Sequence, residues 1–201
     1  MVQEEGTLVA DLPPPQEADI VAAQGGDIRA FENLFRVIQP PLLRYLRTLV
    51  GDEAPDVASE TWLQVTRDLR KFRGGGADFK GWVVTIGRHR ALDHLRAAAR
   101  RPSDPAHPVT LPEASLGDET FNGFDEALAT RRALDLIAQL PHDQAEAVLL
   151  RVVVGLDGPA AAKVLGKRAG AVRMATSRGL ARLQQILADE AAVTLPDSTA
   201  L

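Results

Sequence analysis

A run of small and basic residues near the C-terminal end constrains the fold more than any other segment of this chain. Residues 155–173 indicate a short helix, a turn at Gly166 and a second helix that carries arginine. This order is typical of a helix-turn-helix, whose second helix enters the major groove of DNA. Asp157 is predicted to cap the first helix, because its carboxylate can accept the free backbone N–H groups of the first turn. The segment therefore predicts a helical domain that can contact duplex DNA.

The composition favours an all-α protein without disulfide bonds. Only 4% of the 201 residues are aromatic, and the chain contains no cysteine. A core made of leucine, valine, isoleucine and alanine favours helices. The lack of cysteine excludes thiolate metal sites and fits a reducing compartment. No run of about 18 apolar residues occurs and the N-terminus is acidic, so we expect neither a membrane span nor a signal peptide.

The formal net charge of −4 conceals two basic regions. Residues 67–101 contain ten bases and three acids, and residues 158–188 contain six bases and no acid. Residues 1–19, in contrast, contain five acids and no base. Because local potential rather than total charge attracts phosphate, this distribution favours contact with nucleic acid at two separate places.

The spacing of apolar residues predicts two small helical bundles joined by a flexible linker, the second ending in the helix-turn-helix. We expect Pro40 and Pro41 to end the first long helix, because proline breaks the helical hydrogen-bond ladder. The expected helices cover residues 27–39, 41–50, 56–72, 79–100, 125–139, 141–155, 158–165 and 169–187. The expected domains are a disordered acidic tail (1–18), a first bundle (19–101), a linker (102–123), a second bundle (124–188) and a C-terminal tail (189–201).

Four stretches, in this order, resemble the compact, two-domain extracytoplasmic-function type of bacterial sigma factor. DIRAFENLF (27–35) resembles the opening helix of that family, and DVASETWLQ (56–64) resembles its polymerase-binding helix. FKGW (79–82) with IGRHRALDHLR (86–96) resembles its helix for the upstream edge of the opened promoter. Residues 140–183 resemble its domain for the upstream promoter element. The resemblance implies a cytoplasmic, non-enzymatic initiation subunit whose partners are the RNA polymerase core, promoter DNA and an anti-sigma factor.

The resemblance also assigns roles to individual residues. The residues implied in binding the polymerase core are Asp56, Glu60, Leu63, Gln64 and Arg67. The residues implied in holding the opened promoter, next to a glycine loop at 74–76 that lets backbone approach bases, are Arg73, Lys80, Arg88, His89, Arg96, Arg100 and Arg101. The residues implied in contacting the upstream element are Lys167, Arg168, Gly170, Arg173, Met174, Ser177, Arg178 and Arg182.

The chain departs from the family pattern at several of these positions. Gly87 and His89 stand where alanine and asparagine are common, so the resemblance does not fix the preference of this helix for a promoter. Met174 and Ala175 replace a usual serine and arginine, and Arg168 replaces a usual proline. We therefore expect the recognised upstream sequence to differ from the commonest one of the family.

Simpler interpretations apply to several of the same residues. Without the resemblance, the outer face of helix 56–72 is best interpreted as a solvated amphipathic surface. Trp82 is expected in the core, and Asp93 in a salt bridge within its own helix. The four histidines are scattered and no cysteine occurs, so we expect no catalytic pair, metal site or cofactor.

Two other classes of function stay open at this stage. A stand-alone helix-turn-helix regulator would bind duplex DNA tightly without polymerase. The separate basic segment beside the glycine loop argues against it, because such a regulator needs no grip on single strands. A protein-interaction module that occupies polymerase or an inhibitor without initiating is the third possibility. Promoter-dependent transcription would separate it from an initiation subunit.

Overall fold

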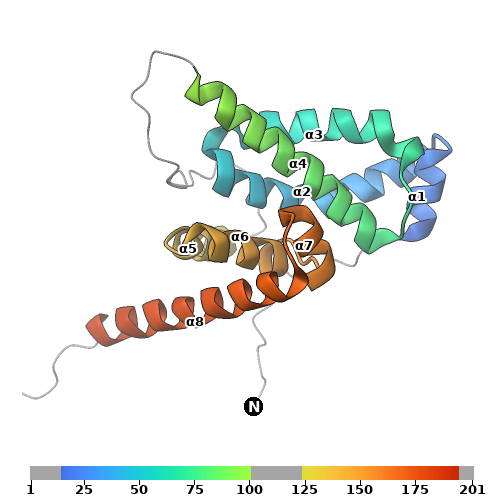
Figure 1. The fold of residues 1–201 in the computed structure, drawn as a ribbon. Helices are drawn as coiled ribbons and strands as arrows, with labels where there is room; N and C mark the ends of the chain where they lie inside the picture. Colours follow the sequence, from blue (N-terminus) through green and yellow to red (C-terminus); the bar gives the residue numbers. More distant parts are fainter. Residues whose placement is uncertain (1–14, 101–123, 195–201) are drawn as a thin grey trace, which may run out of the picture.

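The computed structural model describes residues 15–100 and 124–194, and all regular elements in these ranges are helical (Figure 1). The first bundle consists of α1 (Glu17–Gln24), α2 (Ile28–Val50), α3 (Ala54–Asp68) and α4 (Gly76–Ala99). The second consists of α5 (Phe124–Ala138), α6 (His142–Val148), α7 (Gly158–Leu165) and α8 (Ala169–Thr194). The predicted all-α fold with two helical bundles is confirmed. The expected linker and the outer parts of both expected tails lie outside the described residues.

Short turns of tighter or wider helix connect some of these elements. The 3₁₀ turn η1 (Gly51–Glu53) leads into α3, and η2 (Leu69–Lys71) follows it. A π-helical turn, η3 (Leu149–Val153), continues α6. Within the described ranges, no helix combines the length and the apolar character that crossing a membrane requires.

Helix α2 runs unbroken through Pro40 and Pro41, so the predicted end at these residues is wrong. A proline inside a helix removes a backbone hydrogen bond and costs about 3 kcal/mol or more. The helix continues because apolar residues on both sides are fully buried, with Ile38, Leu42 and Leu46 at 0% exposure. Full burial of each such side chain contributes about 1.5–3 kcal/mol, so the packing of the flanks outweighs the loss.

The first helix, α1, occupies residues whose first part was expected to belong to the disordered tail. The tail prediction for residues 1–18 is therefore wrong at its end, where α1 begins at Glu17. Ile20 and Ala23 are buried and α1 packs against α2, which stabilises a helix too short to persist alone. The Gln24 side-chain amide donates to the backbone carbonyls of Leu69 and Phe72, each at 2.9 Å. These two hydrogen bonds hold the C-terminal end of α1 against the turn after α3.

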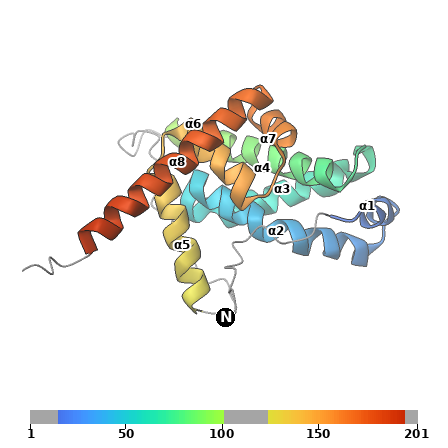
Figure 2. The ribbon, with the colours of Figure 1, turned by 90° about the horizontal axis from the view of Figure 1, so that it is seen from below.

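The helix-turn-helix of the second bundle has the predicted local geometry. The Asp157 carboxylate accepts the backbone N–H of Ala160 at 2.7 Å, which confirms the predicted cap. Gly166 ends α7 at φ +63°, a left-handed conformation that glycine adopts without strain. Helix α8 then crosses α6 and extends away from the bundle (Figure 2).

Helix α8 continues to Thr194, so the predicted helix end at residue 187 and the start of the tail at residue 189 are wrong. The extra turns contain alanines and acidic residues, most of which favour a helix even when exposed. An ion pair between Arg132 Nη2 of α5 and Glu190 Oε2 of α8, at 2.8 Å, lies along this extension. Both side chains are largely exposed, so the pair adds little stability.

The two bundles pack directly against each other, whereas the apolar spacing predicted only two bundles joined by a flexible linker. Their buried residues form one contiguous apolar core. Helix α4 of the first bundle packs on α7 of the second, and α2 contacts η3 (Figure 1). At the α4–α7 contact, a Cβ atom added to Gly81 would lie 3.6 Å from the Cβ of Ala160, an ordinary van der Waals distance.

Candidate functional site

The outer face of α3 is a mixed polar and apolar surface, as the helical spacing of its residues predicts. Leu63 is 56% exposed in the middle of this face, and Gln64 is half-buried. Gln64 accepts a hydrogen bond from Arg90 Nη2 of α4 at 2.6 Å and donates one to Asp68 Oδ2 at 2.5 Å. The remaining predicted polymerase-contacting residues, all exposed, are Asp56, Glu60 and Arg67.

The glycine loop before α4 is shaped by close backbone contacts. A Cβ atom on Gly76 would lie 1.8 Å from the carbonyl oxygen of Pro15, so no larger residue fits there. Gly74 adopts φ +147°, and a Cβ atom there would meet Asp78 at 2.8 Å. Arg73, at the start of the loop, is exposed and donates to the Phe72 carbonyl at 2.7 Å. The glycines therefore fit a tightly packed loop that presents Arg73 to solvent.

An aromatic cluster lies beneath this loop. The ring centroids of Phe72 and Phe79 are 5.1 Å apart, and Trp82 lies 5.1 Å from Phe72. Phe79 is fully buried, while Trp82 is partly buried against the core. Trp82 therefore packs against the edge of the core and keeps part of its surface exposed.

Most of the residues predicted to hold the opened promoter lie on exposed parts of α4 or its loop. The exposed members are Arg73, His89, Arg96 and Arg100, while Arg101 lies outside the described residues. Arg96 Nη1 pairs with Asp93 Oδ1 at 2.8 Å, which confirms the predicted salt bridge within the helix. Two members, Lys80 and Arg88, instead face the second bundle.

Arg88 belongs to a buried polar cluster where the two bundles meet. Its Nε donates to Oε1 of Glu146 at 2.6 Å, and its Nη2 donates to Oε2 at 3.3 Å. The Tyr45 hydroxyl donates to the same Oε1 atom at 3.1 Å. The side chains of Glu146 and Arg88 are only 5% and 18% exposed. A carboxylate at this depth requires such partners, because an uncompensated buried charge is costly.

Burial and charge also determine the protonation of this cluster. Burial, followed by the charge of Glu146, raises the pKa of the Tyr45 hydroxyl well above its usual value, so Tyr45 stays a neutral donor. The hydrogen bond to Glu146 raises the pKa of Arg88. Lys80 is 9% exposed, and burial lowers the pKa of its ammonium group. A Cβ atom on Gly155 would lie 3.4 Å from Lys80 Nζ, so this amine is covered by the loop before α7.

All residues predicted to contact the upstream element are exposed, on α8 and the turn before it. The opposite face of α8 is buried: Val172 is 1% exposed, and a Cβ atom on Gly179 would lie 2.7 Å from Val148 Cγ2 of α6. Lys167 Nζ pairs with Asp143 Oδ1 at 2.7 Å, and this hydrogen bond holds the pKa of Asp143 below its usual value. The structure thus brings Lys167, Arg168, Gly170, Arg173, Met174, Ser177, Arg178 and Arg182 to one end and the outer surface of a single helix-turn-helix.

A groove of about 650 Å³ runs beside this helix, between α8 and the start of α7. Gly170, Arg173 and Ser177, three of the predicted base-contacting residues, line it together with Arg151 of η3. The Arg151 guanidinium donates to the Leu156 carbonyl, which holds the side chain at the groove. Arg151 was not a predicted site residue, because it lies in an apolar run before the motif.

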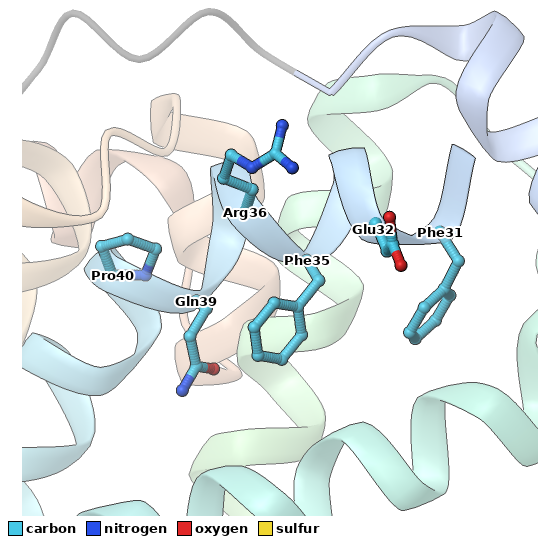
Figure 3. A pocket seen from close by; sticks show the side chains of 6 residues that line it. All are labelled: Phe31, Glu32, Phe35, Arg36, Gln39 and Pro40. Atoms are coloured by element: carbon cyan, nitrogen blue, oxygen red, sulfur yellow. The ribbon is translucent and has the colours of Figure 1, made fainter. Parts of the chain in front are cut away.

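A second hollow, of about 430 Å³, lies on α2 (Figure 3). The Phe31 and Phe35 rings point from α2 toward α3, where the Trp62 ring centroid lies 5.7 Å and 4.9 Å from theirs. Trp62 Nε1 donates to Gln39 Oε1 at 2.7 Å. The residues that line the hollow are Phe31, Glu32, Phe35, Arg36, Gln39 and Pro40, and none of them was a predicted site residue.

The chain matches known proteins over both bundles. The family models Sigma-70 region 2 and Sigma-70, region 4 match residues 34–101 and 130–183. The ECF RNA polymerase sigma factor SigD of Mycobacterium tuberculosis is 36% identical over 177 residues, covering 84% of this chain and 82% of SigD.

Solved structures with a similar fold have lower sequence identity. CnrH, in complex with the cytosolic domain of CnrY, has a TM-score of 0.61 and 23% identity, covering 87% of this chain and 98% of CnrH. The sigma factor RpoE, in complex with the anti-sigma factor NepR from Bartonella quintana, has a TM-score of 0.56 and 24% identity. That match covers 80% of this chain and 98% of RpoE. At these identities the two structures establish the shared fold.

Proposed function

The chain belongs to the ECF RNA polymerase sigma factors, which bind the polymerase core and direct promoter-specific initiation, and on this premise we propose a division of that work among α3, α4 and α8. The observation that carries the proposal is the exposure of every predicted upstream-contacting residue on one helix-turn-helix, whose other face is packed in the core. Such a helix has a free surface for DNA and a rigid support behind it.

Helix α8 and the turn before it read the upstream promoter element. Arg173 lies near the N-terminal end of α8, the end from which a recognition helix reaches base edges. Its guanidinium can donate two hydrogen bonds to guanine, a pair that contributes about 1–3 kcal/mol to discrimination between bases. Arg178 and Arg182, further along the helix, contact phosphates and position the motif without reading sequence.

Helix α3 docks on the polymerase core through its exposed outer face. The apolar Leu63 side chain supplies the buried contact, and the charges of Glu60 and Arg67 around it steer the encounter. The Gln64 bonds to Arg90 and Asp68 hold the centre of this surface rigid before docking. A preformed surface of this kind loses little conformational entropy on binding.

Helix α4 and the glycine loop hold the opened promoter. Opened strands offer unstacked bases and a flexible phosphate backbone, which basic side chains can follow. Arg73 lies at the loop, and the other exposed basic residues lie along α4, so they form a row of basic side chains. Lys80 and Arg88 extend this row on the face that the second bundle covers.

An inhibitory protein is a further partner under this proposal. RpoE, which shares the fold of this chain, was solved with the anti-sigma factor NepR. An anti-sigma factor for this chain would compete with the polymerase core, and pull-down from the native cells with and without added core would detect that competition. We also propose that the chain acts in the cytoplasm, where the polymerase is, and without enzymatic activity of its own.

Reconstitution tests the division of work. Purified chain is mixed with polymerase core and a library of promoter fragments, and core binding and transcripts are measured separately. We expect a complex with the core and transcripts that depend on the chain. Absence of a complex would overturn the assignment of α3. A complex without transcripts would favour an interaction module that occupies polymerase without initiating.

A further inference from the structure

The backbone that leads into the glycine loop is held by α1, a helix to which the proposed division of work gives no task. Gln24 is the last residue of α1 and is half-buried. Its side-chain amide has two N–H groups and donates to the carbonyls of Leu69 and Phe72, each at 2.9 Å. Both carbonyls belong to the turn between α3 and the loop, so one side chain fixes this backbone at two points.

The other side of the loop is also held, whereas its tip is open. The Gly75 N–H donates to Asp78 Oδ2 at 3.4 Å, at the start of α4. A Cβ atom on Gly76 would lie 1.8 Å from the Pro15 carbonyl oxygen, so the residues just before α1 lie against this side. A Cβ atom on Gly75, in contrast, would meet no atom within 4 Å. The tip therefore has room for a group that approaches from outside, between two sides whose backbone is held.

The same contacts fix the cation that the loop presents to solvent. The Phe72 carbonyl accepts a second hydrogen bond, from Arg73 Nη1 at 2.7 Å. Arg73 Nη1 also donates to the Arg70 carbonyl at 2.8 Å. Gln24 and Arg73 therefore meet at one oxygen atom, and a shift of the Phe72 carbonyl would move the Arg73 side chain with it.

From these contacts we propose that Gln24 is a positioning residue for base capture, which holds the glycine loop in the shape that receives one unstacked base of the opened promoter strand. The proposal rests on the proposed function, because it uses the role of this loop in holding opened DNA. Gln24 acts through the backbone of Leu69 and Phe72 and does not touch the base. A loop that already has its binding shape loses little conformational entropy when the base enters. A loop that has this shape only part of the time binds more weakly in proportion to that fraction.

Two substitutions of Gln24 separate its donor groups from its bulk. Gln24→Met removes both N–H groups at a similar side-chain length. Gln24→Lys places an ammonium group at a similar reach, and this group can donate to both carbonyls. Gln185→Met is the matched control, because it removes a glutamine hydrogen bond of 2.8 Å, to Asp189, on an exposed part of α8. Each variant is measured as the full chain in complex with polymerase core.

The probes are promoter fragments whose upstream part is duplex and whose opened strand is single, with one abasic nucleotide at each successive position of that strand. For the natural chain we expect one position at which loss of the base weakens binding most. Gln24→Met should bind the intact fragment about tenfold more weakly, because two hydrogen bonds that support base capture are gone. It should bind the fragment without that base as the natural chain does. Gln24→Lys should restore the preference for the intact fragment, and Gln185→Met should keep it.

Two results for Gln24→Met would overturn the proposal. Unchanged affinity for both fragments would show that the loop keeps its shape without Gln24. An equal loss on both fragments would show that Gln24 supports the fold in general and not the capture of a base. If the natural chain binds every abasic fragment like the intact one, the loop captures no base. That result refutes the proposed function of the loop, and the part of Gln24 with it.

Amide hydrogen exchange of the free chain tests the same contact without DNA. The Phe72 N–H donates to the Leu69 carbonyl at 3.1 Å, in the turn that Gln24 holds. Gln24→Met should raise the exchange rate of this amide about tenfold, because the turn opens more often. The Ala161 amide of the second bundle, which donates to the Asp157 carbonyl at 2.9 Å, should keep its rate. An unchanged rate at Phe72 would overturn the proposal, and so would an equal rise at Ala161, which would indicate a general loss of stability.

Discussion

The Arg88 guanidinium and the Glu146 carboxylate are 58 positions apart in the chain, yet they form a two-pronged ion pair at 2.6 and 3.3 Å between the two bundles. The Tyr45 hydroxyl donates a further hydrogen bond to the same carboxylate. This pair joins the helix proposed to hold opened DNA to the bundle proposed to read the upstream element.

The energetics of this pair follow from its burial. Glu146→Leu leaves Arg88 without its counter-charge at a mostly buried place, and Arg88→Met leaves Glu146 likewise, so each single variant is expected to lose about 3 kcal/mol. The double variant replaces two charges with apolar side chains and should lose much less than the sum. Urea denaturation of the four proteins measures the coupling. Additive losses would contradict a direct interaction.

Arg173 is expected to carry discrimination among upstream sequences. Arg173→Ala should bind preferred and altered upstream duplexes equally, with a loss of about 1–3 kcal/mol on the preferred one. Arg178→Ala is the matched control: it should weaken both duplexes alike and lower the salt dependence of binding by about one phosphate contact. Fluorescence anisotropy at several salt concentrations measures both effects. Retained selectivity in Arg173→Ala would refute the base contact.

Leu63 is expected to be essential for docking on polymerase. Leu63→Asp places a charge at the centre of the α3 surface and should greatly weaken the complex with the core, while the melting temperature stays nearly unchanged because the side chain is exposed. Val21→Asp adds the same charge in place of an exposed apolar residue of α1 and is expected to keep core affinity. Equal losses in the two variants would indicate a general charge effect instead of a specific surface.

Gly179 is expected to be required for the packing of α8 on α6. A Cβ atom at this position would lie 2.7 Å from Val148 Cγ2, so Gly179→Ala must push the helices apart. Crowding of this kind typically costs about 1–3 kcal/mol, against a helix-propensity gain of about 1 kcal/mol. Gly170→Ala, in the same helix, meets no atom within 4 Å and is the control for the gain alone. Thermal unfolding should rank Gly179→Ala as the less stable variant; the reverse order would contradict the close approach.

Asp143 is expected to compete with DNA phosphate for Lys167. The hydrogen bond from Lys167 lowers the pKa of Asp143, so the contribution of the pair is fully present above the usual aspartate pKa of about 3.9 and is lost as the pH falls through the lowered value. The pair is therefore intact at neutral pH. Asp143→Asn should tighten duplex binding at low salt by up to about fivefold. Asp135→Asn on α5 removes an equal charge, and an equal gain there would contradict a local competition.

Local signals were sufficient to predict the caps and turns of the fold. Asp157 and Gly166 act through their immediate neighbours, so the sequence around them predicts the helix-turn-helix. Helix α1 and the unbroken α2 depend on burial against other helices, and Pro40 and Pro41 alone indicate a break. Packing against other helices determines these two elements, and no local pattern in the sequence around them indicates that packing.

The same distinction applies to the candidate sites. Helical spacing was enough to place Leu63 and Arg173 on exposed faces, because each face is set by its own helix. The burial of Arg88 was not predictable, since its partner lies on the other bundle. One signal was available: Glu146 is an acid within an otherwise apolar run, 145–150, and such a residue requires a buried partner.

Mapping of transcript start sites tests whether this chain directs promoter-specific initiation. Polymerase core transcribes genomic DNA from the native cells with and without the purified chain, and the 5′ ends of the transcripts are sequenced. We expect start sites that appear only with the chain and share one upstream sequence at a fixed spacing, and that sequence should lose its enrichment with Arg173→Ala. Identical start sites with and without the chain would contradict it.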